Sequence, residues 1–303
     1  MDNSLQVLHN IVSNVEKVIV GKRNAIELVL ISLICDGHVL IEDVPGVGKT
    51  GLVSAISKSI NASFKRIQFT PDVLPSDITG FSIYNPKTGQ FEFRPGAVMS
   101  HLVLADEINR TSPKTQASLL EVMEEKQVTV DGVTHKLPSP FMVLATQNPV
   151  EYLGTFPLPE AQIDRFFMKI SIGYPLPGEE SKILARYQHS NPLDSLAPVA
   201  ECSDILAIQQ EVRKVHVDES LNNYIVSIVS KTRNHPDVAL GVSPRGSLAL
   251  FRAAQAWALY NQRDYVIPDD IKRMVIPVLS HRIMLKQDAK LKKVSVEDIL
   301  SSI

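Results

Sequence analysis

Hydrophobic and polar positions in the first half of the chain follow two alternating patterns. Stretches with the period of an amphipathic α-helix are separated by short apolar runs bounded by polar or turn residues, which are typical of buried strands. This alternation predicts an α/β fold in which helices cover both faces of a parallel sheet. The strand-like runs lie at 38–42, 64–70, 101–105, 141–146 and 167–172, and the helical stretches at 4–20, 25–35, 50–60 and 113–125.

The pattern changes after the fifth apolar run. Residues 174–178 read Tyr-Pro-Leu-Pro-Gly, which disfavours regular structure. Ser243, followed by a proline, is a strong start signal for one of the helices beyond this point. We therefore predict an α/β domain over residues 1–173 and a smaller all-α domain over residues 174–303. The predicted helices of the second domain lie at 179–189, 203–215, 219–232, 244–261 and 268–280.

Two β-hairpin patterns interrupt the α/β half. In residues 81–94, apolar and polar side chains alternate on both sides of the turn sequence Asn-Pro-Lys-Thr-Gly. In residues 128–135 they flank Asp131-Gly132, a dipeptide typical of type I′ turns. Such insertions either decorate the surface or contact a partner, because loops on a rigid scaffold often carry contacts. Both interpretations stay open.

Composition places the chain among globular proteins. Hydrophobic residues make up 44% and charged residues 21% of the 303 residues, and the formal net charge is −2. Non-specific coating of nucleic acid is not expected, since it requires clustered lysine and arginine. The sequence has no apolar run of about 20 residues and no secretory signal pattern, so we expect a cytosolic protein without membrane contacts. Cys35 and Cys202 are too far apart to form a metal-ligand pair, and we expect no structural metal.

The strongest chemical signal follows the first strand-like run and reads Val-Pro-Gly-Val-Gly-Lys-Thr at 44–50. Its glycines let backbone N–H groups turn toward phosphate oxygens, its lysine can reach the β and γ phosphates, and its threonine hydroxyl can ligate Mg²⁺. The general pattern requires glycine where this chain has Asp43, so a coincidental glycine-rich turn is the alternative. We expect a phosphate-binding loop with the nucleotide-binding residues Pro45, Gly46, Val47, Gly48, Lys49, Thr50 and Gly51.

An acidic pair, Asp106 and Glu107, follows the third strand-like run. Ligands collect at the carboxyl ends of strands in open α/β sheets. Asp106 would then hold Mg²⁺ together with Thr50, while Glu107 would act as the general base on the attacking water. The alternative is that Asp106 caps the next helix and Glu107 is solvated. The preceding phosphate loop favours the catalytic interpretation.

Three further polar residues are weaker candidates. Asn148 follows the fourth apolar run, where an amide can bond both the γ-phosphate and the water, but Asn-Pro is also a common turn sequence. Arg165 and Arg245 are single arginines, which are usually surface or salt-bridge residues. Considered one at a time, these residues do not establish a role.

Three longer sequences are specific in combination. They are Ala-Asp-Glu-Ile-Asn-Arg at 105–110, Ala-Thr-Gln-Asn-Pro at 145–149 and Leu-Pro-Glu-Ala-Gln-Ile-Asp-Arg-Phe at 158–166. With the phosphate loop and the Ser-Pro-Arg sequence at 243–245, the chain resembles the MoxR family of AAA+ ATPases over nearly its whole length. The resemblance implies a P-loop AAA+ core, a helical lid domain, ATP as the nucleotide and Mg²⁺ as its metal ion.

The resemblance also implies a role for each matching residue. In this superfamily an arginine finger reaches the γ-phosphate held by the neighbouring subunit. The hairpins at 81–94 and 128–135 match the helix-2 insert and the pre-sensor-1 hairpin of this clade. The implied roles are Walker A for Lys49 and Thr50, Walker B for Asp106 and Glu107, sensor 1 for Asn148, arginine finger for Arg165, sensor 2 for Arg245, and adenine contacts for Val20 and Gly21.

The resemblance implies an ATP-driven chaperone that remodels or matures a protein client. Proteins with von Willebrand factor A domains would be its partners, and metal or cofactor insertion one of its outcomes. An arginine supplied in trans contributes about 10³–10⁵ in rate, so we expect hydrolysis to require a ring, with six subunits as in AAA+ relatives. A nucleic-acid motor or clamp-loader-like ATPase is the alternative, disfavoured by the balanced charge. A GTPase or small-molecule kinase is a third, but the sequence lacks the Asn-Lys-x-Asp motif for guanine.

Overall fold

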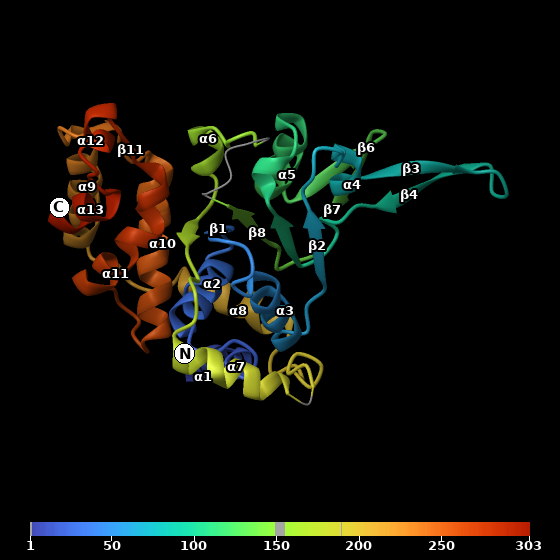
Figure 1. Cartoon of the computed structure of the whole chain (residues 1–303), viewed down its shortest axis with the longest axis horizontal. Coiled ribbons are helices and arrows are strands. Elements are labelled where there is room, and N and C mark those ends of the chain that lie inside the picture. The colour runs from blue at the N-terminus through green and yellow to red at the C-terminus, as the bar shows by residue number, and fades with distance from the viewer. Residues whose placement is uncertain (1, 149–154, 189) are drawn as a thin grey trace.

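Five parallel strands form the centre of the computed structural model, which describes residues 2–148, 155–188 and 190–303 (Figure 1). They pair in the order β2–β5–β8–β1–β9, and every neighbouring pair is parallel. All five correspond to predicted apolar runs, so the predicted parallel sheet is confirmed. The strands are β1 (Val39–Glu42), β2 (Phe64–Gln68), β5 (Leu102–Asp106), β8 (Met142–Gln147) and β9 (Met168–Ile170).

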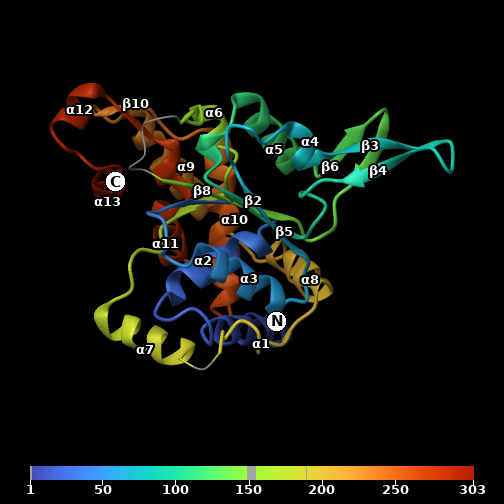
Figure 2. The same cartoon turned by 45° about the vertical axis from the view of Figure 1, so that its right-hand side comes forward.

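Helices cover both faces of this sheet because successive strand side chains point to opposite faces. Val39 and Ile41 of β1 belong to one apolar core, whereas Leu40 between them belongs to a second core on the other face. The predicted α/β fold is therefore confirmed, and Figures 1 and 2 show the two helical layers. The first core includes residues of α1 (Asp2–Val15), α2 (Arg23–Ile34) and α3 (Lys49–Ser59), and the second includes residues of α4 (Pro75–Thr79) and α5 (Pro113–Glu125).

The second half of the chain is mainly helical, as predicted. Ser243 caps α10, because its Oγ accepts the N–H of Gly246 at 3.3 Å. Within the described residues, no helix is both long and apolar enough to cross a membrane. The helices are α7 (Pro177–Tyr187), α8 (Cys202–Val212), α9 (Glu219–Asn234), α10 (Pro244–Tyr260), α11 (Pro268–Leu279), α12 (Gln287–Leu291) and α13 (Val296–Ser302).

The prediction that this half contains only helices is wrong in one detail. Two short strands, β10 (Val238–Leu240) and β11 (Met284–Leu285), pair in antiparallel fashion. Strands this short carry no readable period, and only tertiary packing brings them together. The domain boundary near residue 174 stays a prediction. Helix α8, which follows this boundary, packs on α2 of the first half of the chain, where Gln209 Nε2 donates to the carbonyl of Leu33 at 2.8 Å. Shorter elements are η1 (Ile108–Arg110), α6 (Glu160–Ile163) and η2 (Ser280–Arg282).

Both predicted hairpins are confirmed. β3 (Gly80–Asn85) pairs with β4 (Gln90–Pro95) and projects away from the body (Figure 1). β6 (Gln127–Val130) pairs with β7 (Val133–Lys136), and the turn residues Asp131 and Gly132 have φ of +49° and +79°, both positive as a type I′ turn requires. The ring of Phe93 stacks on that of His135 with 3.9 Å between centroids, so the two hairpins contact each other.

His38, directly before β1, is buried between the sheet and α5. Its Nδ1 accepts the N–H of Val143 at 3.0 Å, so its Nε2 carries the proton and donates to the carbonyl of Met123 at 3.0 Å. Burial is the main influence on its protonation and lowers the pKa of His38 from the ordinary 6.5 to about 4. The folded protein therefore keeps this ring neutral at pH values where the unfolded chain protonates it.

We expect acid to destabilise the protein through His38. Between about pH 6.5 and pH 4, the His38 side chain is protonated in the unfolded chain but neutral in the folded protein. The free energy of unfolding therefore decreases by about 3 kcal/mol as the pH is lowered through this range. Urea unfolding at pH 7 and pH 4.5 should show a weaker pH dependence for His38→Gln than for the wild type. His216→Gln, at an exposed histidine, is the control and should retain the wild-type dependence. An unchanged pH dependence in His38→Gln would contradict the assignment.

Candidate functional site

The predicted phosphate loop connects β1 to α3. Gly46 and Gly48 have φ of +85° and +90°, in the left-handed region that glycine reaches without steric cost. Gly48 is also the N-cap residue of α3, and it has no side chain to bond the N–H groups of the first helical turn. The loop therefore presents glycine backbone and the positive end of a helix dipole, an arrangement that suits phosphate oxygens.

A pocket of about 400 Å³ lies over this loop. Because β1, β2 and β5 are parallel, the residues at their carboxyl ends meet at one edge of the sheet. Val47 is a predicted loop residue outside the lining, and its side chain packs against the apolar core. The loop and the two other strand ends supply the lining residues Pro45, Gly46, Gly48, Lys49, Thr50, Gly51, Arg66, Gln68, Asp106 and Glu107.

Asp106 and Glu107 are held in place by the neighbouring strand β8. Thr146 Oγ1 donates to Asp106 Oδ1 at 2.6 Å and accepts the backbone N–H of Glu107 at 2.8 Å. Glu107 has φ of +58°, a conformation that costs energy for any residue with a Cβ and that is often found at functional sites. Asp106 does not cap the following turn, whose N-cap residue is Glu107. Both carboxylates instead line the pocket.

Two residues of β2 contact these carboxylates and were not predicted. Arg66 donates to Asp106 Oδ2 from Nη2 at 2.6 Å and from Nε at 3.2 Å. Gln68 Nε2 donates to Glu107 Oε2 at 2.8 Å, and Arg110 Nη1 lies 3.0 Å from the same oxygen. The available signal was the spacing of Arg66 and Gln68, two residues apart at the end of a strand. That spacing places both on one face of the sheet at its carboxyl edge.

Asp43, which replaces the first glycine of the general loop pattern, ties the loop to the chain after β9. Its buried carboxylate accepts the N–H groups of Ile172 and Gly173, the second at 3.2 Å, and the hydroxyl of Ser171 at 3.1 Å. Lys49 Nζ donates to the carbonyl of Asp43 at 3.0 Å. Asp43, in place of the first glycine, therefore supplies a carboxylate that accepts from three donors. The glycines at 46 and 48 still form the turn.

Besides Val47, the predicted residues Asn148, Val20 and Gly21 do not line the pocket. Asn148 directly follows β8 and is buried, and Pro149 of the same motif lies outside the described residues. Val20 and Gly21 lie between α1 and α2. Gly21 packs against Glu179 of α7 so closely that a Cβ there would come within 1.9 Å of Glu179 Oε1. The sensor role of Asn148 and the adenine contacts of Val20 and Gly21 stay predictions.

Arg165 and Arg245 meet at the opposite edge of the sheet. Arg165 precedes β9, which is parallel to β1, so it lies near the amino ends of these strands, whereas the phosphate loop follows the carboxyl end of β1. The end of α5 is also at this edge, because Met123 bonds His38 there. Glu124 pairs with Arg165 at 3.2 Å and with Arg245 at 2.5 Å. Both arginines thus lie away from the pocket of their own chain.

Known proteins share this architecture and these motifs. The descriptions "ATPase family associated with various cellular activities (AAA)" and "AAA lid domain" match residues 38–168 and 230–303. The chain is 57% identical to YeaC of Bacillus subtilis (98% of this chain, 93% of that one) and 41% identical to Chaperone MoxR1 of Mycobacterium tuberculosis (99% and 81%). A solved structure from Cytophaga hutchinsonii matches with a TM-score of 0.94 at 41% identity (99% of this chain, 94% of that one). The chain belongs to the MoxR family of AAA+ ATPases.

Proposed function

We propose that this ATPase hydrolyses ATP with Mg²⁺ in the pocket at the end of β1. One observation carries the proposal: the glycine loop, the Lys49 and Thr50 side chains and the carboxylates of Asp106 and Glu107 line the same pocket. Lys49 would exchange the carbonyl of Asp43 for the β and γ phosphates. Glu107 would accept the proton of the attacking water once its carboxylate turns toward it.

The pocket residues fit a magnesium ion that accompanies the nucleotide. Mg²⁺ takes oxygen ligands and is usually held by one or two protein groups plus phosphates and water. Asp106 offers a carboxylate oxygen and Thr50 a hydroxyl on the lining of one pocket. The Asp106 carboxylate already pairs with one cation that lines this pocket, the guanidinium group of Arg66. When bound, the ion supplies positive charge that neutralises the β and γ phosphates.

We further propose that hydrolysis uses two subunits. Arg165 and Arg245 lie at the edge of the sheet opposite the pocket and pair with Glu124 on the surface. A head-to-tail arrangement would bring this edge of one subunit to the pocket of the next, where the guanidinium groups would stabilise charge on the γ-phosphate. We propose a closed ring of six subunits, in which Arg165 is the arginine finger, Arg245 is sensor 2 and Asn148 is sensor 1.

The proposed task of the ring is to remodel or mature a protein client. The name Chaperone MoxR1, borne by a relative that this chain matches at 41% identity, supports this class of function. The hairpins support it as well, because Phe81, Tyr84 and Phe91 of β3 and β4 are exposed on the projecting ribbon, where a client could contact them. Proteins with von Willebrand factor A domains are the proposed partners, and metal or cofactor insertion is a proposed outcome.

Capture of the client on an ATP-bound ring tests the proposal. Glu107→Gln keeps the size of the side chain and one acceptor oxygen but removes the charge and the base, so turnover should fall by about 10²–10⁴-fold while ATP still binds. With ATP, tagged Glu107→Gln should retain a protein client that tagged Lys49→Ala, in which we expect ATP binding to be lost, does not retain. Equal recovery on both variants would contradict the chaperone function, and wild-type turnover in Glu107→Gln would contradict the catalytic assignment.

A further inference from the structure

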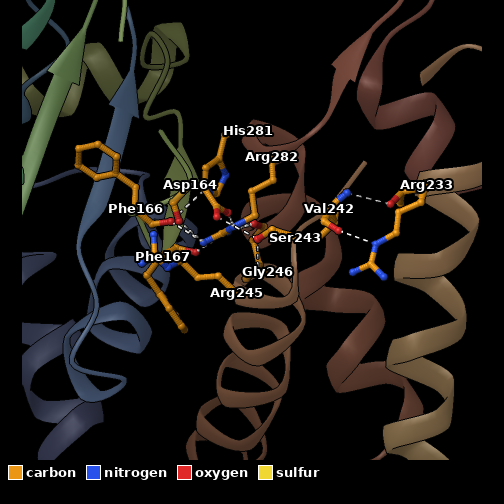
Figure 3. Close-up of polar contacts among 12 residues, drawn as sticks. Asp164, Phe166, Phe167, Arg233, Val242, Ser243, Arg245, Gly246, His281 and Arg282 are labelled. Atoms are coloured by element: carbon orange, nitrogen blue, oxygen red, sulfur yellow. Dashed lines mark hydrogen bonds and ion pairs between the residues drawn. The ribbon is translucent and has the colours of Figure 1, made fainter. Parts of the chain in front are cut away.

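A polar cluster that includes the buried Arg282 side chain joins the segment that carries Arg165 to the helix that carries Arg245 (Figure 3). Asp164 lies at its centre. One carboxylate oxygen, Oδ1, accepts Arg282 Nε at 2.8 Å, and the other, Oδ2, accepts the hydroxyl of Ser243 at 2.9 Å. We call Asp164, Ser243 and Arg282 the latch. None of the three was singled out as a functional residue from the sequence motifs.

The guanidinium group of Arg282 is buried and fully hydrogen-bonded. Its side chain is 2% exposed, and all five of its N–H donors have acceptors. Besides the Asp164 carboxylate, it donates to the carbonyls of Asp164 at 3.2 Å, Phe166 at 2.7 Å and Phe167 at 3.2 Å, and to that of Val278. A buried charge is retained at such a place only when it is paired and hydrogen-bonded. Arg282 therefore holds the backbone on both sides of Arg165.

The latch reaches the second arginine through Ser243. Ser243 is the N-cap residue of α10, and Arg245 lies in the first turn of that helix. Asp164 directly precedes Arg165 in the chain, and its carboxylate contacts Ser243, which lies two positions before Arg245. The backbone of each arginine is fixed relative to the other, although they are 80 positions apart in the chain.

The guanidinium groups themselves remain available. The side chains of Arg165 and Arg245 are 30% and 49% exposed, and their shared partner Glu124 is 37% exposed. Ion pairs at such exposure contribute little to stability, so Glu124 can be exchanged for another anion at small cost. The buried Arg282 side chain holds the backbone around Arg165, whereas the charged ends of both arginines lie at the surface.

We propose that Arg282, Asp164 and Ser243 are positioning residues that present Arg165 and Arg245 as one preformed unit to the nucleotide of the neighbouring subunit. The inference rests on the proposed two-subunit site and adds to it the residues that set its geometry. A displacement of about 1 Å at a transition-state contact can cost on the order of 100-fold in rate. The latch therefore acts on turnover more than on ATP affinity, since it does not touch the pocket of its own chain.

Asp164→Asn tests this role because it keeps the shape of the side chain and removes its charge. We expect kcat to fall about 10- to 100-fold while KM for ATP stays within about twofold. Mixing Asp164→Asn with Lys49→Ala should restore turnover, since the Lys49→Ala subunit still presents an intact latch to its neighbour. Ser243→Gly is a milder second variant, because glycine is tolerated at an N-cap, and it should lower kcat severalfold.

Asp270→Asn is the matched control. Asp270 forms a buried, two-pronged ion pair with Arg263 at 2.5 and 2.6 Å, in the same helical half of the chain. That pair lies beyond the far end of α10, whose 17 residues span about 25 Å. Asp270→Asn should cost stability comparable to that lost in Asp164→Asn, as judged by Tm, and leave kcat and KM unchanged.

The outcomes separate the latch from the two-subunit site. If Arg165→Ala is inactive while Asp164→Asn and Ser243→Gly turn over no more slowly than Asp270→Asn, the latch inference is wrong and the two-subunit site stands. If Arg165→Ala itself retains wild-type turnover, the two-subunit site is wrong and the latch with it. Lost turnover in Asp164→Asn without rescue by Lys49→Ala subunits would also overturn the inference, because the defect would then be a general loss of structure.

Discussion

Lys49→Ala is expected to abolish nucleotide binding. Lys49 lines the pocket, and its ammonium group donates to the carbonyl of Asp43 within the phosphate loop. Removing this ammonium group takes away the expected charge-assisted hydrogen bond to the β and γ phosphates. We expect the Kd for ATP, measured by isothermal titration calorimetry, to rise at least about 100-fold, which corresponds to about 2.7 kcal/mol.

Lys58→Ala provides the control for this measurement. Lys58 lies in the last turn of the same helix α3 and donates to the carbonyl of Leu193, far from the phosphate loop along the helix. The Lys58→Ala substitution removes the same charge from the same helix as Lys49→Ala, so any effect of net charge or helix stability appears in both variants. ATP affinity that is retained in Lys49→Ala, or lost equally in Lys58→Ala, would refute the phosphate-loop assignment.

Arg165→Ala should lower kcat by about 10³–10⁵-fold and leave ATP affinity unchanged. The reason is geometric: Arg165 precedes β9 at the edge opposite the pocket, so its own chain binds nucleotide without it. Turnover of the wild type should also rise steeply with protein concentration, since the site forms only on assembly. Steady-state ATPase assays, with binding measured separately, distinguish this loss of turnover from a loss of affinity.

Mixing two inactive variants tests the shared site directly. Lys49→Ala subunits retain Arg165, and Arg165→Ala subunits retain the pocket, so some interfaces in a mixed ring contain both halves and should recover turnover. A mixture of Lys49→Ala with Glu107→Gln is the control, because both lesions damage the pocket and no interface regains it. Absence of recovery at every ratio of Lys49→Ala to Arg165→Ala would exclude a finger that acts on the neighbouring subunit.

Local sequence was sufficient to predict the framework of the site. The apolar runs at 38–42 and 101–105 predicted two strands of the parallel sheet, and the polar residues that follow them lie at its carboxyl edge. Gly46 and Gly48 indicated the positive φ values that the loop adopts. These features depend on residues within one strand–loop–helix unit, where the period of burial and the steric preferences of glycine act over a few positions.

The contacts made by Asp43 and by Arg66 could not be predicted in this way. Asp43 departed from the loop pattern without an apparent reason until its carboxylate was found to accept donors from residues 171–173. Arg66 and Gln68 are two positions apart, which is typical of one face of a strand, but the partner of Arg66, Asp106, lies 40 positions away on the neighbouring strand. Strand order determines which side chains meet across a sheet, and no local period encodes that order.

The same limit separates the recognisable arginines from the residues that hold them. Short motifs drew attention to Arg165 and Arg245, and the family resemblance supplied expected roles for both. Their position at the edge opposite the pocket follows from the packing of β9, α5 and α10, and the contact of Asp164 with Arg282 spans 118 positions. Hydrophobic period and steric preference specify each element from nearby residues, whereas the placement of charges between elements depends on how the whole chain buries its apolar surface.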